Sequence, residues 1–255
     1  METWRLGDRE FTSRLMVGTG KYRTPAAMQA ALEASGAEVV TVAVRRMDLE
    51  GGDGGILEHL DLKRYTLLPN TAGARTAAEA VRLARLARAA AETNLIKLEV
   101  IGDPETLLPD VVGTLEATRT LVQEDFTVLC YTAPDPVLAL QLEEAGAAAI
   151  MPYGSLIGSG QGIPDFTGIR MVLDRVRVPV VVDAGLGAPS DAALAMELGA
   201  TAVLINTAIA LAADPAGMAT AMKMGVQAGR KAFLSGRIPK RSYASASSPT
   251  TGLPG

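Results

Sequence analysis

The chain has 255 residues, 48% of them hydrophobic but only 4% aromatic, and a formal net charge of −4. This length fits one large domain or two small ones, and the acidic balance argues against a protein that binds nucleic acid. A single cysteine and a single histidine exclude an internal disulfide, a cysteine zinc site and a histidine-rich metal centre. We therefore expect no metal site.

The N-terminal residues METWRLGDREF are charged from the start and lack the apolar core of a secretory signal. No uninterrupted apolar run reaches the roughly 18–20 residues that a membrane span needs. The sequence therefore predicts a cytoplasmic protein with no membrane contact.

Apolar runs and helix-like stretches alternate along the chain. Short apolar runs typical of buried strands occur at residues 15–17, 39–44, 65–68, 95–100, 127–130, 148–151, 178–183 and 202–205. Alanine-rich segments typical of helices occur at residues 25–35, 76–92, 112–123, 136–145, 167–175, 190–198 and 218–234. Residues 50–62 are expected to form one further short helix.

Strict alternation of strand and helix predicts a parallel sheet, and eight such units in a chain of this length favour closure into a (β/α)8 TIM barrel. A doubly wound open sheet is the alternative. That fold more often carries a GxGxxG loop after its first strand, where this chain has Gly18-Thr19-Gly20-Lys21-Tyr22.

Two segments lie outside the repeated units. Residues 4–14 predict a short N-terminal hairpin that turns at Gly7 and Asp8 and closes the barrel floor. Residues 242–255 are rich in Ser, Pro and Gly, which is typical of a flexible tail. We expect a single catalytic domain at residues 1–241, followed by this tail.

The fourth predicted strand carries residues suited to catalysis. Side chains alternate between the two faces of a strand, so Lys97 and Glu99 share the face that lines the barrel interior. Burial favours the neutral, nucleophilic form of an amine. Lys97 is therefore a candidate for imine formation with a carbonyl substrate, and Glu99 for proton transfer. A buried structural Lys–Glu pair is the alternative.

Polar residues also follow the seventh and eighth runs, at the strand ends where the active site of this fold lies. Asp183 is a candidate second acid/base, with loop capping as its alternative role. Gly185 and Gly187 follow it, and Asn206 and Thr207 follow the eighth run. The loops after these two strands usually hold phosphate in a (β/α)8 barrel, so the sequence predicts a phosphorylated substrate.

Other residues at the strand ends carry weaker signals. Residues 152–162 contain four glycines and are expected to approach a ligand closely. Arg45 and Arg46 end the second run, where they suit an anion, a partner protein or a solvated charge pair. His59 is expected to be structural or solvent-exposed, and Cys130 to be a small buried hydrophobe.

Taken in order, these motifs closely resemble bacterial thiazole synthase of thiamine biosynthesis. The Ile-Lys-Leu-Glu-Val-Ile-Gly-Asp segment at residues 96–103 is specific, and the ordered set is far more so. The resemblance covers essentially the whole chain, through segments 18–22, 41–46, 68–73, 96–103, 158–160, 182–185, 206–210 and 246–249.

The resemblance implies a transferase that condenses 1-deoxy-D-xylulose 5-phosphate, dehydroglycine and sulfur into thiazole phosphate carboxylate. The sulfur arrives as a C-terminal thiocarboxylate on a small ubiquitin-like carrier protein. The family works in the cytoplasm as a homo-oligomer, a dimer or a tetramer, with no metal or organic cofactor.

The resemblance also implies roles for particular residues. The lysine that forms an imine with C2 of the ketose falls on Lys97, and the acid/base carboxylates fall on Glu99 and Asp183. The implied sugar-phosphate contacts are Gly158, Ala184, Gly185, Asn206 and Thr207.

The chain departs from the family pattern near the strand ends. Ala74 stands where a cysteine is expected after Asn-Thr-Ala-Gly, and Cys130 stands where a proline is expected before Tyr131. In the loop after the sixth run, Tyr153 and Leu156 replace Leu and Pro. None of these changes falls on the three proposed catalytic residues.

Two other functions stay open on the residues alone. A class I aldolase or a pyridoxal-phosphate-synthase-like barrel would share Lys97 and the phosphate loops, and release of a shorter aldehyde would identify an aldolase. A non-catalytic phosphate-ligand scaffold would still bind its ligand after Lys97→Ala. For the thiazole function, we hypothesise that Arg45, Arg46 and the tail help to form the groove by which the carrier reaches the barrel.

Overall fold

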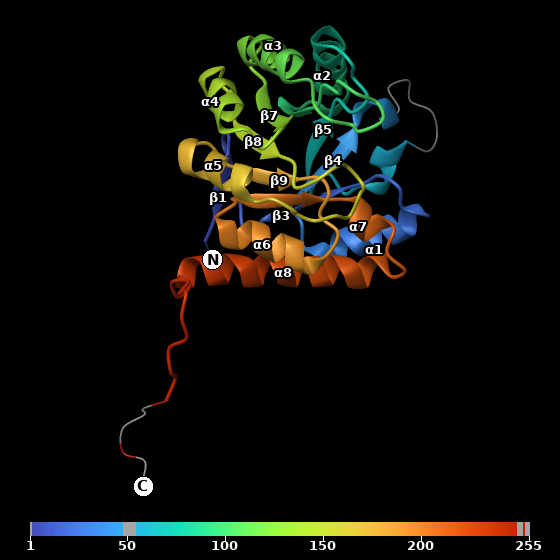
Figure 1. The fold of residues 1–255 in the computed structure, drawn as a ribbon. Helices are drawn as coiled ribbons and strands as arrows, with labels where there is room; N and C mark the ends of the chain where they lie inside the picture. The colour runs from blue at the N-terminus through green and yellow to red at the C-terminus, as the bar shows by residue number, and fades with distance from the viewer. Residues whose placement is uncertain (1, 48–54, 249–251, 253–255) are drawn as a thin grey trace.

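The computed structural model describes residues 2–47, 55–248 and 252, which form a (β/α)8 barrel with a small hairpin at its N-terminus (Figure 1). In the described residues the barrel strands are β3 (Leu15–Gly18), β4 (Val39–Ala43), β5 (Thr66–Asn70), β6 (Leu95–Leu98), β7 (Thr127–Thr132), β8 (Ala149–Pro152), β9 (Val181–Asp183) and β10 (Ala202–Ile205). They are parallel, in the order β8-β7-β6-β5-β4-β3-β10-β9. Parallel bridges from Ile150 to Val180 and from Tyr153 to Asp183 close the barrel between β8 and β9.

Helices cover the outside of the barrel, as the alternating sequence pattern predicts. They are α1 (Pro25–Ser35), α2 (Ala77–Ala91), α3 (Val111–Gln123), α4 (Pro136–Glu144), α5 (Thr167–Arg175), α6 (Pro189–Leu198), the short α7 (Thr207–Ala210) and α8 (Pro215–Ser235). Two 3-10 helices, η1 (Val44–Arg46) and η2 (Ile56–His59), follow β4. The predicted (β/α)8 barrel is confirmed. Of the short helix expected at 50–62, residues 50–54 lie outside the described part, and η2 forms within the rest.

Side-chain caps set where the helices begin. The Thr24 hydroxyl accepts from Ala27 N at the start of α1, and the Thr76 hydroxyl accepts from Glu79 N at the start of α2. Asp214 caps α8 by accepting from Gly217 N at 2.9 Å, with Pro215 in the first turn. This cap explains why α8 begins three residues before the expected start at residue 218.

Two strands are shorter than predicted because side-chain hydroxyls replace ladder partners. Glu99 N donates to Thr71 Oγ1 at 2.8 Å, so β6 ends at Leu98 instead of residue 100. Val180 N donates to Thr201 Oγ1 at 3.2 Å, and β9 begins only at Val181.

The strands bury both faces, as expected for a parallel barrel. On β6, Ile96 and Leu98 pack in the core between the strands and the helices. Leu95 points inward, where it belongs to a second cluster inside the barrel. This alternation also directs Lys97 inward.

The N-terminal hairpin closes the barrel floor. Strands β1 (Trp4–Leu6) and β2 (Arg9–Phe11) pair antiparallel and turn at Gly7, whose φ is +60°. Trp4, Leu6 and Phe11 are buried and share one apolar cluster with inward side chains of the barrel, among them those of residues 16, 68, 129 and 151. The predicted hairpin and its place at the floor are therefore confirmed.

The longest helix, α8, lies across α6 and α1 on one side of the barrel (Figure 1). Gly229 and Gly225 allow a close approach, because a Cβ at either position would overlap the backbone of α6 or of Pro189 at its start. Beyond α8, residues 236–248 are exposed and lead away from the barrel on the side of the N-terminus (Figure 1). None of the helices described is long and apolar enough to cross a membrane.

Candidate active site

A pocket of about 430 Å³ opens at the carboxyl ends of the barrel strands. Its lining comes from the ends of β3 to β6, β9 and β10 and from the glycine-rich loop after β8. All eight residues proposed from the sequence as catalytic or substrate-binding line it: Lys97, Glu99, Gly158, Asp183, Ala184, Gly185, Asn206 and Thr207. The structure therefore brings the proposed set together, while the role of each residue stays a prediction.

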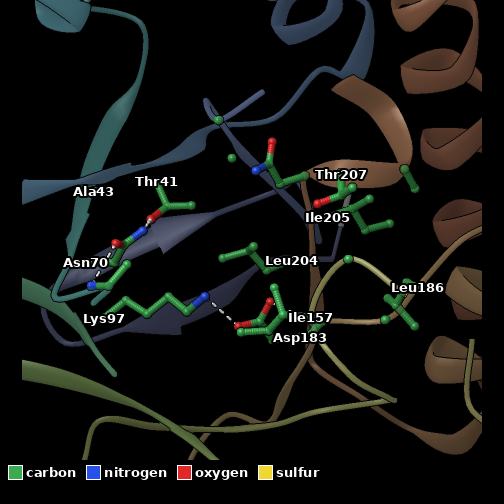
Figure 2. A pocket seen from close by; sticks show the side chains of 18 of the residues that line it. Thr41, Ala43, Asn70, Lys97, Ile157, Asp183, Leu186, Leu204, Ile205 and Thr207 are labelled. Atoms are coloured by element: carbon green, nitrogen blue, oxygen red, sulfur yellow. Dashed lines mark hydrogen bonds and ion pairs between the residues drawn. The ribbon is translucent and has the colours of Figure 1, made fainter. Parts of the chain in front are cut away.

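Lys97 lies between two carboxylates. Its Nζ is 3.0 Å from Glu99 Oε1 and 2.5 Å from Asp183 Oδ2. Figure 2 shows the Lys97 side chain reaching towards Asp183 across the bottom of the pocket. Each of the three residues is at most 6% exposed. The other oxygen of Asp183 accepts from Ala184 N at 2.7 Å, which orients the carboxylate.

This ion pairing decides the protonation state of the lysine. Burial alone lowers the pKa of the Lys97 amine, but the charges of Asp183 and Glu99 outweigh burial and raise that pKa above its usual value. The expectation that burial makes the amine neutral is therefore wrong for Lys97 between these two carboxylates. Lys97 is an ammonium with two proton acceptors in contact, so it becomes a nucleophile only by giving a proton to one of them.

Tyr131 lies beside Lys97, outside the pocket lining, and the sequence reasoning missed it. It lies on β7 inside the barrel, 1% exposed, with its ring centroid 5.6 Å from Lys97 Nζ and 6.3 Å from the ring centroid of Tyr153. Burial, together with the Asp183 and Glu99 charges, raises the pKa of its phenol, which therefore stays neutral. The predicted strand stopped at Cys130, whereas β7 continues to Thr132 and includes this inward position.

The loops after β8 and β9 form one glycine-rich wall of the pocket. Ala184 and Gly185 both adopt positive φ, +61° and +74°, and Gly154 N donates to Asp183 O at 2.9 Å. Gly162 N donates to Gly185 O at 2.8 Å. A Cβ at Gly185 would overlap Ser155 Oγ. The two loops thus fit together only because this position has no side chain.

Asn206 ties the end of β10 to the end of β3. With its amide nitrogen facing β3, it donates to the carbonyl oxygens of Gly20 at 2.9 Å and Gly18 at 3.2 Å. A Cβ at Gly18 would lie 2.6 Å from Asn206 Cβ, so the glycine makes room for this side chain. Asn206 therefore has a structural role, and the substrate contact predicted for it from the sequence stays a prediction.

Lys21 places a positive charge near the glycine-rich wall. It lies in the loop after β3 with φ +67°, and its Nζ is 3.7 Å from where a Cβ on Gly158 would stand. Thr207 lies 3.9 Å from the same point. The Gly-Thr-Gly-Lys loop at residues 18–21 was the available sequence signal for this charge.

Asn70 and Thr41 form the polar side of the pocket next to Lys97. Asn70 pairs with Lys97 in the β5–β6 ladder and donates from Nδ2 to Thr41 Oγ1 at 3.0 Å, while its Oδ1 accepts from Ala72 N at 3.2 Å. Figure 2 shows this chain of contacts above Lys97. The sequence reasoning did not select Asn70 as a site residue.

The two neighbouring arginines take different positions. Arg46 lines the pocket, and its Nη1 donates to Thr19 O at 3.2 Å. Arg45 instead donates to Gly73 O at 2.9 Å and is not among the lining residues. The described part of the tail leaves the end of α8 opposite α7, and so away from the pocket (Figure 1). Of the three elements expected to form the carrier groove, only Arg46 lines the pocket, and the groove itself stays a prediction.

The remaining reactive residues lie elsewhere. His59 is on η2, outside the pocket lining. Cys130 is buried on the helix-facing side of β7, and burial raises the pKa of its thiol to about 12, so it is an inert core residue as expected. Among the described residues, no group of three or more His, Cys, Asp or Glu side chains is arranged to hold a metal.

Fold and pocket together define the class: a (β/α)8-barrel enzyme with a lysine between two carboxylates at the strand ends. Residues 5–249 match the model of the family described as thiazole biosynthesis protein ThiG, and the chain belongs to that family, the sulfur-transferring thiazole synthases of thiamine biosynthesis. The predicted family resemblance is confirmed.

Individual relatives agree with this assignment. The chain is 57% identical to a thiazole synthase of Geobacter sulfurreducens, covering 98% of this chain and 96% of that protein. It is also 57% identical to a thiazole synthase of Acaryochloris marina, with 98% and 94% covered. A solved Amycolatopsis orientalis BexX/CysO complex contains a chain that superposes with a TM-score of 0.87 at 37% identity, covering 95% of this chain and all of that one.

Proposed function

We propose that the chain makes the thiazole through an imine between Lys97 and C2 of 1-deoxy-D-xylulose 5-phosphate, with dehydroglycine and carrier-borne sulfur as the other substrates. The observation that carries this proposal is the contact of Lys97 Nζ with two carboxylates at 2.5 and 3.0 Å inside the pocket. An amine in this setting has both a proton acceptor and a partner for the cationic product.

Imine formation conserves the charge of this site. Asp183 or Glu99 takes one Lys97 proton, the amine adds to C2, and the former carbonyl oxygen leaves as water after receiving that proton and a second one from the nitrogen. The product is a protonated imine, so the nitrogen is cationic before and after the reaction. The ion pairs that raise the pKa of Lys97 therefore also stabilise the iminium.

The iminium acidifies the proton at C3. A carboxylate, Glu99 or Asp183, removes that proton, and the electron pair of the C–H bond neutralises the iminium. The carbonyl character then moves along the sugar, where the sulfur and dehydroglycine can be joined to it. Both carboxylates already contact the lysine nitrogen, so neither needs a large movement to reach the adjacent carbon.

The phosphate end of the substrate fits the glycine-rich wall. In this proposal Gly158, Ala184 and Gly185 contact the phosphate through their backbone, and Asn206 and Thr207 complete the set. The close fit of the β8 and β9 loops supports a rigid anchor, since Gly154 and Gly162 hydrogen-bond across them. Lys21 supplies a charge beside Gly158 that balances the phosphate.

Borohydride trapping tests the imine. Incubation with the ketose phosphate, reduction and peptide mapping should place one ketose-sized adduct on Lys97, because reduction converts the imine into a stable secondary amine. Lys97→Arg is the matched variant, since it keeps the positive charge between Asp183 and Glu99 but cannot form this imine. An adduct on another lysine, or an equal yield in Lys97→Arg, would rule the proposal out.

Sulfur delivery is proposed to come from a ubiquitin-like carrier protein that ends in a thiocarboxylate. The related BexX chain was solved as a complex with CysO, which supports a protein partner for this chain as well. Arg46 lines the pocket and is exposed, whereas Arg45 is held against Gly73. Its place on the pocket lining supports the proposal that Arg46 meets the acidic end of the carrier.

Charge-reversal variants test separately how Arg45 and Arg46 contribute to carrier binding. Arg46→Glu should weaken carrier binding by about fivefold or more, since it replaces an attraction to the thiocarboxylate with a repulsion. Arg45→Glu should have the smaller effect, because Arg45 faces Gly73. Calorimetric titration of each variant with the carrier measures the difference. Equal binding by Arg46→Glu and the parent chain would remove Arg46 from the interface.

We also propose that the chain is a cytoplasmic homo-oligomer, a dimer or a tetramer, with its catalytic domain at residues 1–241. These points rest on the family resemblance. Size-exclusion chromatography with light scattering would distinguish the two assemblies, and a monomer at micromolar concentration would contradict both.

A further inference from the structure

A second cavity, of about 800 Å³, lies at the opposite end of the barrel from the active site. It is lined by Leu15, where β3 begins, whereas the active-site pocket is lined by Gly18, where β3 ends. The segment 12–15 after the hairpin forms one side, and one face of α8 forms the other, with residues 223, 226, 227, 230, 231 and 234. We call this space the floor cavity.

The floor cavity is strongly basic. Arg14, Lys223, Arg230 and Lys231 line it, and Glu2 is the one acidic residue among its described lining residues. Glu38 accepts hydrogen bonds from Thr12 and Ser13 and is not among the lining residues. Lys223 and Lys231 form no ion pair with any described residue. The cavity therefore has more positive charge than its own carboxylate neutralises.

Two arginines hold Glu2 as they would hold a bound oxyanion. Arg230 donates from Nε and Nη2 to the two oxygens of Glu2, at 3.0 and 2.5 Å. Arg14 Nη2 lies 3.3 Å from the same carboxylate. Arg14 is only 8% exposed, and its Nη1 donates to Thr201 O at 2.7 Å, so its position is fixed by the barrel. A forked contact from one arginine and a buried second one is a built anion site.

Glu2 is a replaceable occupant of this site. Its side chain is 43% exposed, and the residue belongs to no helix or strand. A carboxylate brings one negative charge, whereas a phosphate group brings up to two and a third oxygen. Arg14 and Arg230 contact this position, and Lys223 and Lys231 line the same cavity. A volume of about 800 Å³ also leaves room for an organic group attached to the phosphate.

We propose that the floor cavity is a second anion site, which binds a phosphate-bearing small molecule in exchange for the Glu2 carboxylate. The site is separate from the phosphate wall of the active-site pocket and shares no lining residue with it. It does not depend on the proposed catalytic role of Lys97.

The single tryptophan of the chain reports on this cavity. Trp4 donates from its indole Nε1 to Ser13 O at 2.9 Å, and Ser13 lines the floor cavity. Release of Glu2 and entry of an anion beside Ser13 should change the indole environment. Titration with pyrophosphate at constant ionic strength, followed by tryptophan fluorescence, should therefore give a saturable response.

Four variants test whether the fluorescence response comes from pyrophosphate bound in the floor cavity. Arg230→Gln should weaken pyrophosphate binding at least about tenfold, because it removes charged hydrogen bonds. The double variant Lys223→Gln with Lys231→Gln should weaken it too, without disturbing the Glu2 contacts. Glu2→Gln should tighten it about threefold, since the internal competitor loses its charge. Thr207→Val, at the active-site pocket, should leave the fluorescence response unchanged.

Three results would overturn the proposal. A response of equal strength in the parent chain, Arg230→Gln and the lysine double variant would mean an adventitious ion only. A response lost in Thr207→Val would place the anion in the active-site pocket. A fluorescence change that follows protein concentration, with a matching increase in mass by light scattering, would show that a second copy of the chain fills the cavity.

Discussion

At Lys97, burial and the neighbouring charges shift the pKa of the amine in opposite directions. Its side chain is enclosed inside the barrel, which disfavours an ammonium, yet two carboxylates contact its nitrogen and favour one. The raised pKa of Lys97 means that the second effect wins. The positive charge of Lys97 stabilises the folded chain in full below about pH 10.4, the pKa of a lysine in the unfolded chain. This stabilisation is lost only as the pH rises through the higher pKa that Lys97 has in the folded chain.

Removal of one carboxylate should shift this balance. In Asp183→Asn the attraction that raises the pKa of Lys97 is weaker, so the pH midpoint of the initial rate of borohydride-trapped adduct formation should move down by about one to three units. In the parent chain, this initial rate should rise with pH throughout the range from about 7 to 10. Quantitative mass spectrometry across this range measures both profiles.

A distant aspartate provides the control for this shift. Asp174 is exposed on α5, outside the pocket lining, so Asp174→Asn should leave the midpoint where it is in the parent chain. If Asp183→Asn moved the midpoint upwards, Asp183 would not be the group that holds the Lys97 proton.

At the scale of elements, the loop after β9 depends on one glycine. Gly185 has φ +74°, and a Cβ there would overlap the Ser155 side chain and approach its backbone nitrogen to 2.7 Å. The loops after β8 and β9 would then have to separate. The phosphate wall proposed for the substrate consists of these same loops.

Gly185→Ala should therefore lower both stability and substrate affinity. We expect a loss of about 2–4 kcal/mol in the free energy of unfolding, from positive φ and overpacking together, and a higher KM for the ketose phosphate. Gly236→Ala is the matched control. Gly236 has φ +73° where α8 gives way to the exposed tail, and a Cβ there would have no neighbour within 4 Å, so this variant should lose less stability than Gly185→Ala and leave KM unchanged.

Urea denaturation and steady-state kinetics distinguish these outcomes. Equal loss in the two variants would mean that backbone strain alone matters at Gly185 and that Ser155 moves aside without cost. An unchanged KM in Gly185→Ala would separate this loop from the substrate.

At the scale of the whole molecule, the barrel has two ends with different tasks. The carboxyl ends of the strands hold the pocket with Lys97, while the hairpin seals the other end with Trp4, Leu6 and Phe11. The floor cavity lies between that sealed end and α8. A change at the floor can therefore affect stability without touching the catalytic side chains.

Phe11→Ala tests this separation. Phe11 is buried in the inner cluster beside Trp4, with ring centroids 5.3 Å apart, so truncation should cost about 3–5 kcal/mol in the free energy of unfolding. Arg9→Ala, an exposed position on the same strand, should cost less than about 0.5 kcal/mol. Under native conditions, kcat of both variants should stay within about twofold of the parent value, since the active-site pocket of the folded barrel is unchanged. A small stability loss in Phe11→Ala would mean that the hairpin is not part of the cooperative core.

The barrel, its hairpin and the inward direction of Lys97 and Glu99 could all be predicted from the sequence. These features follow from local periodicity: alternation along a strand, helix caps, and the regular spacing of apolar runs. The same pattern placed Asp183 and Asn206 at strand ends, because every parallel strand of a barrel ends at the same edge. Predicted boundaries were wrong where a side chain such as Thr71 replaced a ladder partner.

Three features could be known only from the tertiary structure. They are the charge of Lys97, the position of Tyr131 beside it, and the different positions of Arg45 and Arg46. Each depends on contacts between segments that are far apart in the chain, and local periodicity does not determine such contacts. Lys97 illustrates the reason. Burial, visible in the strand pattern, predicts a neutral amine, but the Asp183 carboxylate from another strand lies 2.5 Å away and keeps it charged.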